Sequence, residues 1–378
     1  GETGEEIAAN AAEVMKEILG SAGPKAPMGV NEQAAATLRR QLQGAGPAVA
    51  GHRPLEMIFL GTGSAAPSKL RNSSAILFRN PNYAIGSILI DVGEGTFAQM
   101  FRALGSQEKV DGAIRSLGLI WISHHHIDHH LGLLRLLERR AQLISAGVPL
   151  QPLVVIGPRS VRAFIDKTMP LIARTVRYID FSEYQRLPDV QHIMFQFVGI
   201  QFLQSVPVIH CRDSFGLVLQ LRSGEKIVYS GDTRPCKSLA QAGKGATLLV
   251  HEATFDDSMQ EAAKKKRHST FSEALGIGHD MGAKFVMLTH FSQRYPRSIA
   301  LRKGVQFEEK DGPEGRDLAK KEFVLAFDLM RVEVSTNGLT NAIDATQRLT
   351  KYFTHLQQQR SKSEPTDDTK YRGESSSE

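Results

Sequence analysis

Short apolar runs recur through the middle of the chain, and each is bounded by glycine or polar turn residues. Runs of this length, rich in β-branched and aliphatic residues, predict strands. The predicted strands are 57–60, 87–90, 117–122, 153–156, 216–221, 227–229, 248–250 and 285–288. Helical patterns at 97–104, 131–146 and 160–168 lie between them. Many strands with a few interposed helices indicate a layered α/β sandwich.

The two ends of the chain differ in amino-acid composition from this middle part. Residues 1–50 are rich in Ala, Gly and Glu, with helical patterns interrupted by Gly and Pro. Residues 353–378 are rich in Gln, Ser, Lys and Glu and almost lack apolar side chains, which predicts disorder. We therefore expect a partly helical linker at 1–50, one folded domain at 51–352 and a disordered tail. Because the chain begins with Gly, we also expect it to be part of a longer protein.

Composition restricts the class of protein without defining it. The 378 residues are 41% hydrophobic and 23% charged, which is typical of a globular domain. The sequence contains no apolar run long enough to predict a membrane span. Two cysteines, Cys211 and Cys236, are too few for a disulfide framework and fit a reducing compartment. The net charge of +6 is compatible with a polyanionic partner but does not require one.

A histidine-rich run follows the predicted strand 117–122 directly. His124 and His126 alternate along an extended segment, so both side chains project to the same side. Asp128 and His129 follow where the chain turns into a helix. Imidazole nitrogen and carboxylate oxygen are the ligands favoured by zinc, although manganese or iron can use them too. A solvated polyhistidine loop is the alternative, but such a loop explains neither the aspartate nor the position between strand and helix.

Three later residues offer ligands for a second metal ion. His210 closes an apolar run, Asp232 follows Ser-Gly after the predicted strand 227–229, and His290 comes just after the predicted strand 285–288. Aspartate is a poor strand former, and its two oxygens can bridge two ions. All three residues follow strands, so we predict a dinuclear site at one edge of a sheet.

The ordered set His-x-His-x-Asp-His, a later His, Ser-Gly-Asp-Thr and a strand-final His resembles the metallo-β-lactamase superfamily. Segments 59–64 and 91–96 resemble the first signatures of that superfamily, and Asp91 can anchor neighbouring loops. The resemblance implies an αββα sandwich with two Zn²⁺ ions at one sheet edge. It implies one zinc on His124, His126 and His210, a second on Asp128, His129 and His290, and a bridge through Asp232.

Further segments are similar to tRNase Z, the endonuclease that removes 3′ trailers from precursor tRNA. Residues 67–72 match its Pro-x-Lys-x-Arg-Asn loop, 251–254 its His-Glu-Ala-Thr motif, and 268–270 its His-Ser-Thr loop; 291–295 are also similar. The resemblance covers roughly residues 55–335. Each motif is weak alone, but their order makes the resemblance specific.

One interval departs from the short forms of tRNase Z. Those forms insert a long tRNA-gripping arm between the third histidine and the bridging aspartate, whereas here only a short hairpin at 211–231 fills that interval. The chain therefore resembles the C-terminal catalytic half of a long form, whose N-terminal half carries the arm. The resemblance implies that precursor tRNA and this N-terminal half are partners, in the nucleus or the mitochondrion.

The resemblance also implies roles in catalysis. Asp128 binds metal and accepts a proton from the nucleophile, while His268, oriented by Glu252, protonates the leaving 3′ oxygen. The tRNA then keeps a 3′-hydroxyl and the trailer a 5′-phosphate. Without the resemblance, His268 would be taken for a surface residue after the basic run 264–267. Expected RNA contacts are Thr62, Ser64, Lys69, Arg71, Asn72 and Arg294, with Arg71 harder to replace than Lys69 because a guanidinium suits phosphate better.

Two alternative functions are compatible with parts of this pattern. The first is another hydrolase of the same superfamily, acting on a phosphodiester, a thioester or a lactam. The second is a non-catalytic binding half that has lost its metals. The complete set of seven predicted ligands argues against the second alternative. The 67–72 loop and the Glu252–His268 pair argue against the first.

Overall fold

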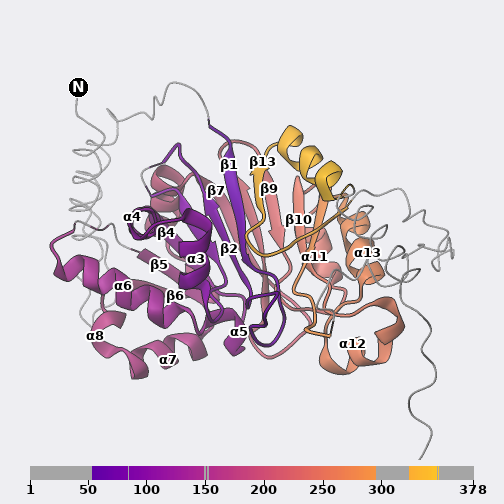
Figure 1. The fold of residues 1–378 in the computed structure, drawn as a ribbon, viewed down its shortest axis with the longest axis horizontal. Helices are drawn as coiled ribbons and strands as arrows, with labels where there is room; N and C mark the ends of the chain where they lie inside the picture. Colours follow the sequence, from indigo (N-terminus) through magenta and orange to yellow (C-terminus); the bar gives the residue numbers. More distant parts are fainter. Residues whose placement is uncertain are drawn as a thin grey trace, which may run out of the picture.

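The computed structural model describes residues 53–83, 85–148, 150, 153–294, 323–346 and 348. Two β-sheets pack face to face, and helices cover both outer faces (Figure 1). This αββα arrangement confirms the predicted fold. The predicted linker at 1–50 and tail at 353–378 lie outside the described residues. Within the described residues no helix is both long enough and apolar enough to span a lipid bilayer.

The first sheet has the strand order β13-β1-β2-β3-β4-β5-β6. Its strands are β1 (Leu55–Gly61), β2 (Ala75–Arg79), β3 (Ser87–Ile90), β4 (Leu117–Trp121), β5 (Leu153–Gly157), β6 (Val176–Asp180) and β13 (Arg331–Val334). Strands β3 to β6 run parallel, and the others pair antiparallel. The helices beside this sheet in Figure 1 are α3 (Thr96–Leu104), α4 (Gln107–Arg115), α6 (Leu133–Ser145), α7 (Arg159–Thr168) and α8 (Pro170–Ala173).

The second sheet has the order β12-β11-β10-β9-β8-β7. Its strands are β7 (Ile200–Pro207), β8 (Phe215–Leu221), β9 (Lys226–Tyr229), β10 (Leu248–Glu252), β11 (Phe285–Thr289) and β12 (Phe323–Leu325). Strands β9 to β12 run parallel. Helices α11 (Lys237–Ala242) and α13 (Phe271–Met281) lie beside it, with α12 (Gln260–Lys266) near its end. The crossover between the sheets contains α9 (Phe181–Tyr184), α10 (Pro188–Ile193) and a π-helix at Met194–Val198.

The central strands of both sheets are buried on both faces, which explains why they are almost continuously apolar. Along β1, Met57 and Phe59 point into the core between the sheets. The alternate residues Ile58 and Leu60 point into the core beneath the helices of the first layer. This alternation follows from the two-residue repeat of an extended strand.

All eight predicted strands are present, and β3 has the predicted bounds. Strands β2, β6, β12 and β13 were not predicted, and β7 was predicted only as an apolar run near its end. The helix predicted at 131–146 is α6, and it is preceded by a separate one-turn helix, α5 (Ile127–His130). This turn directs Asp128 and His129 into the protein, where both are buried.

The carboxyl ends of β4, β9, β10 and β11 meet at one edge of the sandwich. Parallel strands place their ends on the same side, so the loops that follow them converge. The loop after β3 approaches the backbone of α5 so closely that a Cβ on Gly93 would lie 2.3 Å from the Asp128 carbonyl oxygen. Only glycine fits there, and this close packing holds the polar residues of the edge together.

Candidate metal centre and catalytic edge

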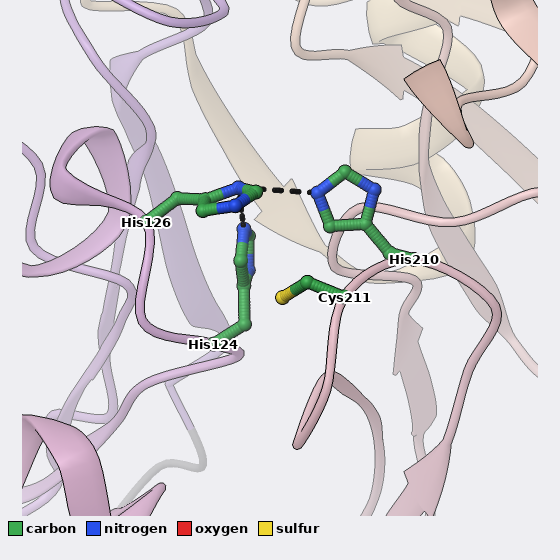
Figure 2. Close-up of side chains that lie close together, drawn as sticks. All are labelled: His124, His126, His210 and Cys211. Atoms are coloured by element: carbon green, nitrogen blue, oxygen red, sulfur yellow. Dashed lines mark hydrogen bonds between the residues drawn. The ribbon is translucent and has the colours of Figure 1, made fainter. Parts of the chain in front are cut away.

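Three histidines converge at the edge of the sandwich. His124 and His126 lie in the loop after β4 and face His210 from the loop between β7 and β8 (Figure 2). The Nδ1 atom of His126 lies 3.0 Å from His124 Nε2 and 3.1 Å from His210 Nε2. Nitrogens bound to one tetrahedral zinc ion at 2.0–2.1 Å lie about 3.3 Å apart, so the observed spacing fits a shared cation.

A second group lies beside the first. The Nε2 atoms of His129 and His290 are 3.2 Å apart, and Asp128 Oδ2 lies 3.4 Å from His290 Nε2. Asp232 faces both groups, because its Oδ2 is 3.6 Å from His124 Nε2 and its Oδ1 is 3.3 Å from His290 Nε2. The structure thus brings the seven predicted ligands together at one place.

Four of the five histidines have their Nδ1 atoms fixed by an oxygen behind the site. These oxygens are Ser123 Oγ for His124 (2.9 Å), Asp91 Oδ2 for His129 (2.8 Å), the Arg267 carbonyl for His210 (2.9 Å) and Thr254 Oγ1 for His290 (3.0 Å). An oxygen partner at Nδ1 selects the tautomer whose Nε2 lone pair is free for a metal.

Asp91 is the anchor of this outer layer. It is fully buried and accepts hydrogen bonds from the Ser123 N–H at 2.7 Å, the Ser123 hydroxyl at 2.9 Å and the Tyr229 hydroxyl at 2.8 Å. Its φ of 54° is unusual for a residue with a side chain, and His290 shares this conformation with a φ of 59°. Strained backbone of this kind is concentrated at functional sites.

The histidines of the first group are electrically neutral at pH 7. Burial lowers the pKa of His124 and of His210, and burial together with the neighbouring His210 lowers the pKa of His126 to about 4. Neutral imidazoles keep the lone pairs that a metal needs.

The second group contains an excess of buried negative charge. Burial alone would lower the pKa of His129, but the carboxylates of Asp232 and Asp128 raise it well above its usual value. Burial alone would raise the pKa of Asp128, but His129 and His290 lower it. Asp232 Oδ1 is buried and accepts no hydrogen bond from the described residues. Buried carboxylates require compensation, so the residues present fit divalent cations.

A carboxylate–imidazole pair borders the metal ligands. Glu252, the last residue of β10, lies with Oε1 2.8 Å from His268 Nδ1, and the His268 ring stacks on that of His290 at 5.6 Å. Burial disfavours the imidazolium, but the Glu252 carboxylate outweighs this effect and raises the pKa of His268 to about 9. With Nδ1 directed at Glu252, the ring atom left to exchange a proton is Nε2.

The residues predicted to contact RNA divide into exposed and buried ones. Lys69 and Arg294 are exposed and Asn72 is half-buried, whereas Ser64 and Thr62 are buried. Arg71 is only 8% exposed; its NH1 donates to Thr62 Oγ1 at 2.8 Å and its guanidinium lies 4.5 Å from the centre of the Phe291 ring. In this arrangement Arg71 shapes the loop, and its contact with phosphate stays a prediction.

Asp328 is a functional-site residue that sequence reasoning missed. Its carboxylate accepts hydrogen bonds from the Thr62 N–H (2.9 Å) and hydroxyl (2.8 Å), the Asn72 N–H (2.6 Å) and Gln99 Nε2 (2.9 Å). It therefore ties the end of β1 to the 67–72 loop and to α3. The available signal was its place just after β12, which runs parallel to β11 and ends at the same edge.

The residues of the basic run 264–267 have different contacts. Lys264, Lys265 and Lys266 are exposed on α12. Arg267 instead adopts a φ of 57° and donates from NH1 to the His210 carbonyl at 2.8 Å, while its own carbonyl faces His210 Nδ1. Arg267 is exposed as well, but it clamps His210, one of the predicted metal ligands.

The geometry defines an edge rich in metal-binding side chains on an αββα sandwich. A family model described as the beta-lactamase superfamily domain matches residues 87–291. The chain belongs to this superfamily.

Two curated relatives show which members of the superfamily this chain is similar to. The chain is 41% identical over 290 residues to the rat protein named zinc phosphodiesterase ELAC protein 2, an alignment covering 73% of this chain and 33% of that protein. It is 38% identical over 303 residues to the Arabidopsis thaliana protein named tRNAse Z TRZ4, mitochondrial, covering 64% of this chain and 32% of that protein. These names confirm the predicted resemblance. The chain spans about a third of the length of these relatives.

Two solved structures are similar to this one. A long-form RNase Z from yeast matches with a TM-score of 0.67 and 23% identity, over 96% of this chain and 50% of that one. The short-form human tRNase Z matches with a TM-score of 0.52 and 27% identity, over 74% of this chain and 99% of that one. The first of these likenesses concerns the fold alone.

Proposed function

We propose that this chain is the catalytic part of a zinc-dependent endoribonuclease that removes 3′ trailers from precursor tRNA. The cleavage leaves a 3′-hydroxyl on the tRNA and a 5′-phosphate on the trailer. The observation that carries the proposal is the pairing of two ligand groups through Asp232 with the Glu252–His268 pair 2.8 Å apart beside them. The names of the relatives add the substrate and the metal.

The ligand groups suit two zinc ions. His124, His126 and His210 would hold one, Asp128, His129 and His290 would hold the other, and Asp232 lies where its carboxylate could serve both. Bound there, the ions would lower the pKa of water and neutralise charge on the scissile phosphate. Manganese or iron is also compatible with these nitrogen and oxygen donors.

Protein side chains accept and donate the protons of the reaction. Asp128 Oδ2 is held by the Ala65 N–H at 2.7 Å, and this carboxylate accepts the proton of the attacking water. His268 is charged below pH 9 and gives its Nε2 proton to the leaving 3′ oxygen. Burial alone would raise the pKa of Glu252, but the neighbouring His268 lowers it. Glu252 also accepts hydrogen bonds from the Thr233 N–H at 2.9 Å and the Thr254 hydroxyl at 2.7 Å, and so keeps the imidazole oriented.

The substrate and its partner extend beyond this chain. The loop that carries Lys69 and Asn72 borders the site and is suited to phosphate contact. Arg294, which follows His290 closely in the sequence, is also exposed. Between His210 and Asp232 only the β8–β9 hairpin is present, so this chain has no arm in that interval. An N-terminal half carrying the tRNA-gripping arm therefore completes the enzyme, in the mitochondrion or the nucleus.

A trailer-cleavage assay tests the proposal. The chain is incubated with a precursor tRNA, with and without the N-terminal half of the longer protein, and with bis(p-nitrophenyl) phosphate as a small phosphodiester. We expect cleavage at the trailer junction when the two halves are combined. Hydrolysis of only the small ester, even with both halves present, would favour another phosphodiesterase of the superfamily.

A further inference from the structure

Cys211 lies against the three-histidine group without belonging to the predicted ligand set. It follows His210 in the loop 208–214, and its half-buried side chain points toward the histidines in Figure 2. Its sulfur lies within 4.8 Å of a ring nitrogen of His124, His126 and His210. It is also 3.8 Å from His125 Nδ1, which borders the same group.

A cation bound by these three histidines has a fourth coordination position, which either Asp232 or Cys211 could fill. Asp232 Oδ2 is 3.6 Å from His124 Nε2 and 3.7 Å from His210 Nε2, but it is also 3.4 Å from His129 Nε2. The carboxylate is therefore shared between two metal positions, whereas Cys211 faces only one. In a tetrahedral site with metal–nitrogen bonds of 2.0–2.1 Å and a metal–sulfur bond of 2.3 Å, sulfur and nitrogen lie about 3.5 Å apart. The sulfur therefore has to approach these nitrogens by at most about 1.3 Å, which a rotation of its side chain provides.

We propose that Cys211 is an alternative fourth ligand, which makes the His124–His126–His210 group an N₃S site for thiophilic cations such as Cd²⁺. On binding, the thiol releases its proton to solvent and its sulfur forms a bond to the cation. Thiolate sulfur favours soft cations, while zinc is satisfied by three imidazoles and the Asp232 oxygen.

This inference rests on the three-histidine metal position and not on the cleavage of RNA. The test therefore uses metal binding as its readout. The purified chain is stripped of metal with a chelator and titrated with Cd²⁺ alone, and the ultraviolet sulfur-to-cadmium charge-transfer band is recorded. The variants are Cys211→Ser and, as the matched control, Cys236→Ala, which removes the buried cysteine near Pro207 and Ser238.

We expect the band in the wild type and in Cys236→Ala, and its loss in Cys211→Ser. The Cd²⁺ affinity of Cys211→Ser should fall by about 10-fold or more, the range typical of lost metal-site interactions, while its zinc content stays that of the wild type. A band that persists in Cys211→Ser overturns the proposal, as does Cd²⁺ binding to the wild type without any band. Loss of zinc from Cys211→Ser would also overturn it, because Cys211 would then be an ordinary zinc ligand. Circular dichroism and thermal melting establish that each variant is folded.

Discussion

Individual side chains at the sheet edge are held from behind before any metal is considered. The Nδ1 atom of His129 is hydrogen-bonded to Asp91, and that of His290 to Thr254, so each imidazole directs Nε2 toward the centre. Asp128 is held by the Ala65 N–H, whose residue has a φ of 70°. This preorganisation means that single substitutions should separate ligand, proton-transfer and positioning roles.

Asp128→Ala is expected to abolish trailer cleavage because it removes both a metal ligand and the acceptor of the nucleophile's proton. Binding of tRNA should stay near the wild-type value, since the proposed RNA contacts lie elsewhere. Cleavage and gel-shift assays on the same preparations measure the two effects. Glu261→Ala, at a largely exposed position on α12, is the control. Wild-type turnover in Asp128→Ala would contradict the assigned role.

His268→Ala is expected to slow cleavage by about 10²–10⁴-fold, the usual contribution of a positioned proton donor. Zinc content should not change, because the proposed ligand groups do not include His268. Single-turnover kinetics and metal analysis provide the two measurements. If zinc is lost with the imidazole, His268 is a ligand and the proposed proton donor is wrong.

Glu252→Gln is expected to shift the pH dependence of cleavage. Burial lowers the pKa of His268 and the Glu252 carboxylate raises it to about 9, so the acid is protonated below that pH and activity falls as pH rises through it. Without the carboxylate, burial dominates, and the falling limb should move to lower pH. Rate profiles from pH 6 to pH 10 test this; an unmoved limb would show that Glu252 does not set this pKa.

At the scale of elements, the site depends on which strands end side by side. Strands β9, β10 and β11 are parallel neighbours, so Asp232, Glu252 and His290 follow adjacent strand ends. β12 adds Asp328 at the same edge, where its carboxylate joins the end of β1 to the 67–72 loop. This loop includes Asn72, which donates from Nδ2 to the Glu94 carbonyl at 2.8 Å.

Asp328→Ala is expected to loosen this loop. It leaves the Thr62 and Asn72 N–H groups without their acceptor, at a cost of about 1–3 kcal/mol for each buried donor left unsatisfied. We expect a lower thermal midpoint and slower RNA cleavage at unchanged metal content. Asp344→Ala, at an exposed position in the helix 336–346, is the control. Equal melting of the two variants would show that Asp328 does not stabilise the loop.

On the scale of the whole molecule, the metal centre joins the two sheets. Its ligands come from the loop and turn after β4 of the first sheet and from loops after β7, β9 and β11 of the second. Metals that bind only this assembled state stabilise it by mass action. We therefore expect bound metal to contribute to folding as well as to chemistry.

Removal of metal by a chelator is expected to lower the thermal midpoint of unfolding. A ligand present at 100 times its Kd stabilises the native state by about 2.7 kcal/mol, which corresponds to a shift of several degrees for a domain of this size. Scanning calorimetry before and after chelation, with metal analysis of both samples, measures the shift. Re-addition of Zn²⁺ should restore it, and an unchanged midpoint after confirmed metal loss would contradict a metal centre that spans both sheets.

The sequence by itself determined the strands around the site and the identities of the proposed ligands, because alternating apolar runs and clustered histidines are local patterns. The resemblance of segment 91–96 to a superfamily signature indicated Asp91 as an anchor. Only the tertiary structure revealed the clamp of Arg267 on His210, the burial of Arg71 and the tie through Asp328. These contacts join residues 57 to 266 positions apart, and their geometry depends on which strand ends become neighbours in the folded protein.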